Sequence, residues 1–429
     1  MRKTEYPALA ETVYRETLEN GLEICVVPRP GFQKKSAYFV TDFGAIHRQF
    51  TVDGKEVVAP MGVAHFLEHK MFDLPGRDVT AEFAAMGVSP NAFTSNDMTA
   101  YYFSGTENFY PALKLLLEFV TTAYFNDESV AKEQGIIGQE IGMNEDSPDT
   151  RVFENLMASL YENHKVREPI LGTVETIGEI TPEILHLCHK SFYRPDNMLL
   201  CVVGDVDPEQ VAAIAKEGTP EKPARQVAAV RRWQEEMVCP RPMVRDTMEV
   251  AMTTFQLGFK CEPADQGIDA VRAEFVGDLA AEALFGESSP LYLRLYESGL
   301  IDGSFGGGYE TVEGMAMLTA YGDSRDPEAV RDAILEEAAR ICREGIDEKD
   351  FLRMKRSAMG RRIRGLDSFD SLCFRICAYH LSGFDYFRFP AVYEALEAKE
   401  IPELLGRVVT KERCGLSIID PTETEAEYE

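Results

Sequence analysis

Two histidines and a glutamate form the pattern H-x-x-E-H at His65, Glu68 and His69. Residues 63–72 contain no glycine or proline, so we expect a helix over about residues 59–72. His65 and His69 are four residues apart and share one face of such a helix. Two neutral imidazoles on one face can bind one Zn²⁺. Glu68 flanks them and can accept a proton from a water that the metal activates.

A third metal ligand is available in a later segment, where we expect a helix over about residues 128–143. Glu133 and Glu140 are seven residues apart, which is two helical turns, so they share a face. One of them can complete a site of two histidines and one glutamate with an open fourth position. The other can lie behind the ligands and orient them. The spacing does not choose between them. The alternative, two ordinary histidines on a half-buried helix, leaves the available third ligand unexplained.

Further stretches strengthen this interpretation, because together with the histidine motif they resemble the M16 metallopeptidases, the family of the pitrilysins, the insulinases and the mitochondrial processing peptidases. The order H-x-x-E-H is the inverzincin signature. The other matching stretches are Glu16–Leu22, Asn91–Ser95, Phe192–Met198 and Val203–Val206. The likeness covers most of the first half at specific positions and the second half more loosely, and it is closest to bacterial single-unit members.

The resemblance implies a role for each of these residues. His65, His69 and Glu140 would be the ligands of one zinc ion per chain. Glu68 would be the general base, and Glu133 the supporting carboxylate. The chain would then be a zinc metalloendopeptidase that hydrolyses peptides or short unfolded polypeptides. Processing of one small peptide and general peptide turnover both stay open.

The resemblance also implies a substrate-binding strand at Asn91, Ala92 and Phe93. In the family this region is a sheet edge beside the zinc, and it binds substrate as an added strand. The residues alone, which lead into the β-branched and aromatic stretch 99–104, favour an ordinary internal strand.

Composition excludes several other classes of protein. The net charge of −28 argues against a nucleic-acid binder and fits a well-solvated acidic surface. The first residues lack the apolar run of a signal peptide, and no stretch reaches the roughly 18 apolar residues of a membrane span. The 9 cysteines are scattered without a C-x-x-C pair, so we expect reduced thiols and a cytoplasmic location.

A chain of 429 residues needs more than one core. Proline and charged residues dominate residues 218–245, so we expect a zinc-bearing domain at 1–217, a linker at 218–245 and a second domain at 246–429 without a zinc motif. Each half begins with strands and ends with helices, with a strand expected at 247–259 and a helix at 369–381. The fold class is therefore α+β. Two similar, sequence-divergent halves, each a mostly antiparallel sheet with helices packed on it and facing each other, would fit, and the family is built that way.

The second half departs from the family in one respect. Many relatives carry an Arg and a Tyr around a Gly-Leu pair, and these contact the substrate carbonyl. Here Leu295 and Asp302 stand at those positions, and Arg294 or Tyr309 would have to substitute. We therefore expect a dimer, formed with a zinc-less sister subunit of similar fold or, as the second choice, with a second copy of this chain. The alternative is a monomer whose second half supplies other donors from positions that the sequence does not reveal. The alternative function is that of a non-catalytic peptide-binding or scaffolding subunit of such a heterodimer.

Overall fold

The computed structural model describes residues 1–221, 227–228, 230 and 232–422, which form two compact units. The first unit comprises Met1–Ile141, Pro169–Arg231 and Arg361–Pro390, and the second comprises Gly142–Glu168, Arg232–Gly360 and Ala391–Glu429. Each unit thus takes segments from both halves of the sequence. The domain boundaries expected around the linker at 218–245 stay a prediction, and part of that linker lies outside the described residues.

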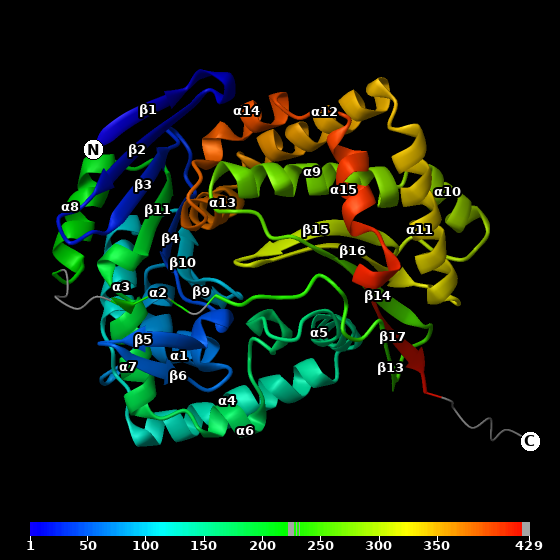
Figure 1. Cartoon of the computed structure of the whole chain (residues 1–429). Coiled ribbons are helices and arrows are strands. Elements are labelled where there is room, and N and C mark those ends of the chain that lie inside the picture. The colour runs from blue at the N-terminus through cyan, green and yellow to red at the C-terminus, as the bar shows by residue number, and fades with distance from the viewer. Residues whose placement is uncertain (222–226, 229, 231, 423–429) are drawn as a thin grey trace, which may run out of the picture. The chain divides into compact units, whose positions relative to one another are not determined.

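The first unit is built on a seven-stranded sheet in the order β1-β2-β3-β11-β4-β10-β9 (Figure 1). Strand β11 is parallel to β3, and the other neighbouring pairs are antiparallel. The strands are β1 (Arg2–Tyr6), β2 (Glu11–Thr17), β3 (Glu23–Pro28), β4 (Lys35–Thr41), β9 (Ser89–Thr94), β10 (Thr99–Gly105) and β11 (Met198–Gly204). Every residue of β11 is buried, as expected for a central strand that is covered on both faces.

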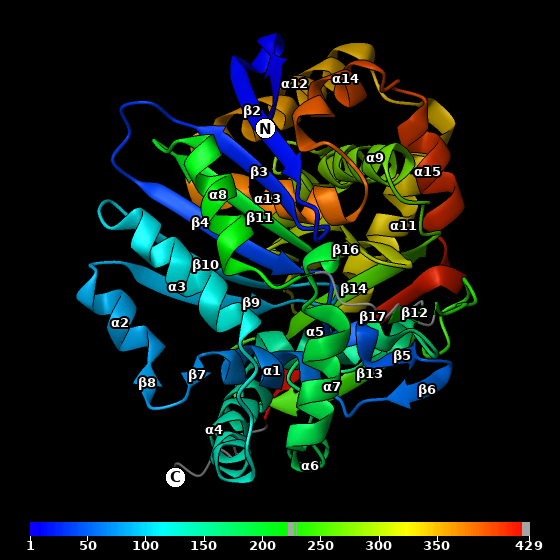
Figure 2. The same ribbon diagram turned by 90° about the vertical axis from the view of Figure 1, so that its left-hand side faces the viewer.

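Helices cover both faces of this sheet. Helices α1, α3 and α8 contact strands on one face of the sheet, and Figure 2 shows α3 and α8 side by side. Helix α13 lies across β4 and β11 on the opposite face. The helices of this unit are α1 (Val63–Met71), α2 (Val79–Ala85), α3 (Phe109–Thr121), α4 (Asp127–Glu145, which continues into the second unit), α6 (Val174–Gly178), α7 (Pro182–Phe192), α8 (Pro208–Gly218) and α13 (Phe369–Leu381). Short strands complete it: β5 (Gln49–Val52), β6 (Lys55–Val58), β7 (Asp73–Leu74), β8 (Arg77–Asp78) and β12 (Val227–Ala228).

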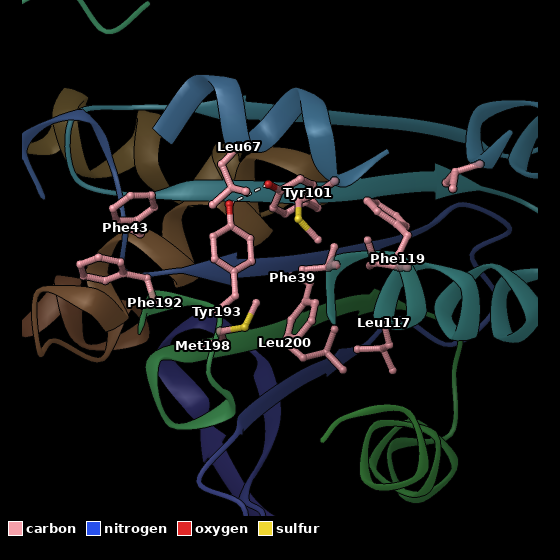
Figure 3. Packing of buried hydrophobic residues seen from close by; sticks show 14 of the residues in the cluster. Phe39, Phe43, Leu67, Tyr101, Leu117, Phe119, Phe192, Tyr193, Met198 and Leu200 are labelled. Atoms are coloured by element: carbon pink, nitrogen blue, oxygen red, sulfur yellow. Dashed lines mark hydrogen bonds between the residues drawn. The ribbon is translucent and has the colours of Figure 1, made fainter. Parts of the chain in front are cut away.

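The main core of the first unit lies between the sheet and α1 and α3. Phe39 of β4, Tyr101 of β10 and Leu200 of β11 are fully buried, and Figure 3 shows them together with Phe119 of α3 and Leu67 of α1. The hydroxyl groups of Tyr101 and Tyr193 are hydrogen-bonded to each other at 2.7 Å, which satisfies both polar atoms inside the core. This packing fixes α1 against the sheet.

The second unit is built on a five-stranded sheet in the order β13-β17-β14-β16-β15. Helix α5 packs on β14 and β17, and α9 packs on β15 and β16. The strands are β13 (Met243–Met248), β14 (Thr254–Cys261), β15 (Gly306–Val312), β16 (Met315–Asp323) and β17 (Cys414–Pro421). The helices are α5 (Pro148–Leu160), α9 (Ile268–Phe285), α10 (Pro290–Glu297), α11 (Pro327–Glu344), α12 (Glu348–Gly365, which continues into the first unit), α14 (Phe389–Glu394) and α15 (Glu400–Val408).

The mixed α and β fold class predicted from the sequence is confirmed, with helices on a mostly antiparallel sheet in each unit. The helix expected at 369–381 has these bounds in the structure. The single strand expected at 247–259 is wrong. The chain leaves β13 after Met248 and begins β14 at Thr254, and the two strands pair with opposite edges of β17 rather than forming one run.

Candidate metal centre

Helix α1 brings the two histidines of the motif together. It begins after Gly62, whose φ of +84° is a left-handed conformation that favours glycine. A Cβ at this position would also lie 2.3 Å from the carbonyl oxygen of Leu171, so only glycine fits here. The rings of His65 and His69 lie 4.6 Å apart between their centroids, one turn from each other.

Helix α4 brings its two glutamates to the same place. The side chain of Glu140 lies 3.7 Å from Nε2 of His65 through Oε1 and 3.6 Å from Nε2 of His69 through Oε2. Oε1 of Glu133 is hydrogen-bonded to Nδ1 of His69 at 3.0 Å. Ile137 and Ile141 on the same helix are buried in the core and hold this orientation.

Three of these side chains could together hold a metal ion. One ligand atom each from His65, His69 and Glu140 lies within 4.8 Å of the others, and no other group of this kind occurs among the described residues. Glu133 contacts the ring of His69 at Nδ1, whereas Glu140 lies near Nε2 of the same ring. The geometry therefore distinguishes the positions of Glu133 and Glu140 at the site, which their spacing in the sequence could not do.

Glu68 lies beside this group and is itself buried, with 8 % of its surface exposed. Its Oε2 accepts a hydrogen bond of 2.6 Å from Oγ1 of Thr94 on β9. Burial raises the pKa of Glu68, although this hydrogen bond opposes the shift. A carboxylate with a raised pKa is a better proton acceptor near neutral pH than an ordinary one.

The two histidines have different environments. Burial, helped by the neighbouring His69, lowers the pKa of His65 to about 3, so this ring is neutral at pH 7. Its Nδ1 is buried without a hydrogen-bond partner in the described part of the chain. Burial also lowers the pKa of His69, but the hydrogen bond with Glu133 and the charges of Glu68 and Glu140 outweigh burial and leave that pKa raised.

The expected substrate-binding residues lie on β9, which is the last strand of its sheet and pairs only with β10 among the described residues. Ala92 is packed against the core, on the same face as Thr94. The ring of Phe93 lies on the opposite face, 5.8 Å from that of Phe374 and 6.2 Å from that of Tyr102. Asn91 is hydrogen-bonded through Oδ1 to the backbone N–H of Ala92. The structure thus brings β9 next to Glu68 through Thr94.

Sequence reasoning missed Thr94 as a partner of Glu68. Thr94 lies within Asn91–Ser95, one of the stretches that resemble the family, and strand alternation places it on the face of Ala92. Thr94 reaches the carboxylate because β9 packs beside α1. The spacing of residues in the sequence does not indicate that contact.

Comparison with known proteins gives consistent matches over the whole chain. Residues 55–174 match the family model described as "Insulinase (Peptidase family M16)", and residues 179–358 match "Peptidase M16 inactive domain". An uncharacterized zinc protease of Bacillus subtilis, YmfH, is 35% identical over 98% of this chain and 99% of its own length. A second one, YmxG, is 25% identical over 84% of this chain and 86% of its own length.

Solved structures agree with these matches. An M16-like peptidase from Alicyclobacillus acidocaldarius has a TM-score of 0.92 and 32% sequence identity, covering 96% of this chain and 99% of that protein. A protease from Helicobacter pylori has a TM-score of 0.81 at 17% identity, covering 95% of this chain and 99% of that protein, and shows the fold alone. In the described part of the chain, every helix is too short or too polar to cross a membrane.

Proposed function

Because this chain belongs to the M16 family of peptidases, we propose that it is a zinc-dependent endopeptidase acting on peptides or short unfolded polypeptides. The observation that carries the proposal is the grouping of His65, His69 and Glu140 within 4.8 Å, with the buried Glu68 beside it. Relatives named zinc proteases support the choice of metal. One such group of ligands corresponds to one zinc ion per chain.

The ligand atoms fit zinc. Two ligand atoms bound to one tetrahedral zinc at about 2.0–2.1 Å lie about 3.4 Å apart, close to the 3.6 and 3.7 Å between the Glu140 oxygens and the imidazole nitrogens. Glu133 would hold the ring of His69 in place through Nδ1, the usual arrangement behind a ligating histidine. When bound, zinc supplies a Lewis acid that polarises the scissile carbonyl and acidifies the attacking water.

Glu68 would act as general base. Its carboxylate accepts the proton of the attacking water and returns it to the leaving amine. The hydrogen bond from Thr94 occupies one oxygen, Oε2, and leaves the other for this proton. Burial of the side chain excludes competing water and raises its pKa, which suits it to both steps.

Strand β9 would bind the substrate. Its outer edge has no partner strand among the described residues, so an extended peptide can pair with the backbone there. Of the three residues expected to contact substrate, Ala92 would face the side of Glu68, and Asn91 and Phe93 the opposite side. A peptide on this edge would therefore run past the candidate metal centre.

The test is the variant Glu68→Gln, measured with a quenched peptide and by metal analysis. We expect zinc content to stay near one per chain while kcat falls by about 10²–10⁴, the usual contribution of a general base. Glu128→Gln is the matched control, because Glu128 is an exposed glutamate at the start of α4. Retained cleavage in Glu68→Gln would remove the base assignment.

The alternative function is that of a non-catalytic, peptide-binding or scaffolding subunit. Two residues of the second unit support this alternative. Leu295 is buried there, and Asp302 bonds to Ser304, so neither offers a donor to a substrate carbonyl. A chain that binds no zinc at neutral pH, with zinc supplied, would support the scaffold. About one zinc per chain, lost in His69→Ala, would support the enzyme.

Contacts within the second unit also support a partner. Arg294 forms an ion pair of 3.5 Å with Glu337, and the ring of Tyr309 packs on Gly277, where an added Cβ would lie 2.2 Å from the ring. Both suggested substitutes for the family's Arg and Tyr are thus already engaged. We therefore propose a zinc-less sister subunit that supplies the missing donors, with a homodimer as the second choice. Full activity per molecule in a dilute, monomeric sample would contradict both.

The nine free cysteines support a cytoplasmic location, since eight of them are buried as thiols and one, Cys342, is exposed. Fractionation of cells that produce the tagged full-length protein tests this proposal. Recovery of the protein outside the cytoplasm would contradict it.

A further inference from the structure

Four buried cysteines of the first unit meet on the sheet face beneath α13. Cys25 of β3 and Cys201 of β11 are in-register partners on neighbouring parallel strands, so their side chains lie on the same face. Cys373 and Cys377 are one turn apart on α13, which packs on β11. The exposed fractions of the four residues are 3 %, 0 %, 0 % and 1 % in chain order.

The thiol of Cys201 is the centre of this cluster. It lies beside Cys25, its partner on β3, and beneath α13, the helix that carries Cys373 and Cys377. The cluster also belongs to a longer row of paired residues that crosses the sheet from strand to strand. In order, the row is Arg15, Cys25, Cys201, Tyr38, Tyr102 and Asn91.

We propose that Cys25 and Cys201 form a redox-active dithiol, which hydrogen peroxide oxidises to a disulfide between β3 and β11. Neighbouring strands lie about 4.7–4.9 Å apart, and the Cα atoms of a disulfide lie about 4.4–6.8 Å apart. An in-register pair on one sheet face therefore meets the Cα requirement without a change of fold. This site is separate from the candidate metal centre, which lies on the opposite face beside α1.

The surroundings make the two thiols unequal. A hydrogen bond from Cys201 lowers the pKa of Cys25 against the effect of burial, and the guanidinium of Arg15 lowers it further. Burial raises the pKa of Cys201. Cys25, which is also the in-register partner of Arg15, is therefore assigned as the attacking residue and Cys201 as the resolving thiol, since the thiolate is the nucleophilic form.

Arg15 also connects the cluster to the surface. Its guanidinium bonds to Oδ1 of Asp385 at 2.8 Å and to the hydroxyl of Tyr6 at 2.8 Å. The side chain of Arg15 is 25% exposed, whereas the thiols are enclosed. The side chain of Arg15 thus extends from the surface to the position of its strand partner Cys25. The carboxylate of Asp385 opposes the thiolate, but its pairing with Arg15 offsets that charge.

The reaction balances with hydrogen peroxide as the only co-reactant. The Cys25 thiolate attacks one peroxide oxygen, the O–O bond breaks, and hydroxide leaves, which gives a sulfenic acid on Cys25. The sulfur of Cys201 then attacks the sulfur of Cys25. An S–S bond forms, and the sulfenic hydroxyl leaves as water with the proton of Cys201. The two thiols lose two electrons, and the peroxide is reduced to water.

A metal ion is a weaker explanation of the cluster. Among the described residues, only His65, His69 and Glu140 bring three ligand atoms within 4.8 Å of one another. The thiols are therefore arranged around Cys201 as pairs rather than around a common centre. A pairwise arrangement suits a disulfide, which needs two sulfurs, and not a tetrahedral site, which needs four.

The experiment oxidises the full-length, zinc-loaded protein with hydrogen peroxide at neutral pH. The protein is then denatured, free thiols are alkylated, and peptides are mapped by mass spectrometry. We expect a cross-linked peptide pair containing Cys25 and Cys201 that has lost two hydrogen atoms and that dithiothreitol separates. Cys342 is the internal comparison, because it is the one exposed cysteine of the nine.

Two variants sharpen the result. In Cys201→Ala, Cys25 should stop at the sulfenic acid and be trapped by dimedone, whereas Cys377→Ala should still give the bridge. The proposal is overturned if Cys25 and Cys201 stay alkylatable in wild-type protein after Cys342 has been oxidised. It is also overturned if the bridge forms only in urea, or if the bridge that forms lacks Cys25.

Discussion

The sheets of the two units contain the same five-strand arrangement. The order β3-β11-β4-β10-β9 in the first unit corresponds to β13-β17-β14-β16-β15 in the second. In both, the second strand is parallel to the first and antiparallel to the third, and the remaining pairs are antiparallel. The difference between the units therefore lies in the side chains that the shared arrangement carries.

The helix beside the last strand differs most. In the first unit, α1 brings Glu68 to Thr94 of β9, and the histidines lie on the same helix. In the second unit, α9 brings Gly277 against the ring of Tyr309 on β15, which is a close apolar contact. One arrangement of strands thus supports a candidate metal centre in one unit and a plain packing contact in the other, because chemistry depends on the side chains that the fold presents.

The helix on the opposite face differs as well. Helix α13 covers β4 and β11, and α5 covers the corresponding β14 and β17. Beneath α13 lie Cys201 and its neighbouring thiols, whereas beneath α5 lie Gly258 and Gly415. A Cβ on Gly415 would lie 2.8 Å from Oγ of Ser159, so α5 approaches its sheet closely. Among the described residues of the second unit, the thiol cluster therefore has no counterpart beneath α5.

The largest expected effect separates the two glutamates of α4. Glu140→Gln should release zinc on dialysis, because Glu140 faces both imidazole Nε2 atoms. Glu133→Gln should keep zinc with about 10–100-fold weaker affinity, the usual effect of losing a group behind a ligand. Metal content by mass spectrometry and a competition titration measure both. The reverse pattern would exchange the two roles.

The next largest effect is the loss of stability when alanine replaces a glycine whose backbone is in the left-handed conformation. Gly62→Ala should destabilise the first unit by at least about 3 kcal/mol, since it adds a clash with the carbonyl of Leu171 to the backbone strain. Gly76→Ala is the control, because its φ is +67° with no atom within 4 Å of the added Cβ. It should cost only about 1–2 kcal/mol. Urea unfolding measures both, and equal losses would show that the contact at Gly62 is not limiting.

Acid should weaken the first unit through a histidine that the candidate centre does not use. His189 donates from Nε2 to the carbonyl of Val120, and burial lowers its pKa to about 4. The unfolded state binds the proton from about pH 6.5 downward, so stability from this group is present above that pH and is lost towards pH 4. The expected loss between pH 7 and pH 5 is about 2 kcal/mol.

Urea unfolding at both pH values measures this loss. His189→Phe should reduce the difference between pH 7 and pH 5 by about 2 kcal/mol. His186→Gln is the control on the same helix, because His186 is exposed. An unchanged pH dependence in His189→Phe would contradict the prediction.

Sequence was sufficient where a feature is local. The helix that carries His65 and His69 follows from four-residue spacing without a breaker, and the bounds of α13 follow from its helical pattern. The expected strand at 247–259 failed because residues 249–253 turn away between two strands that each pair with β17. Strand β15 begins with three glycines, which weaken any local signal, and its pairing with β16 decides its structure.

Contacts between segments that are distant in the chain could not be predicted from the sequence. The hydrogen bond between Thr94 and Glu68 needs β9 beside α1, and the choice between Glu133 and Glu140 needs the position of α4 relative to the histidine rings. The thiol cluster joins Cys25 and Cys201 with residues of α13 that lie far along the chain. Spacing within the sequence carries no information on these contacts.

The smallest expected effect tests what β9 adds to α1. Thr94→Val removes the hydroxyl that donates to Oε2 of Glu68 and keeps the shape of the side chain. A hydrogen bond to a charged group contributes about 1.5–3 kcal/mol, so kcat should fall at least about tenfold. KM should stay the same, because the carboxylate is then less well oriented while the strand edge is unchanged. Thr94→Ser retains the hydroxyl and should retain most of kcat. If both variants lose kcat equally, the methyl packing of Thr94 matters rather than its hydrogen bond, and if neither does, α1 alone positions Glu68.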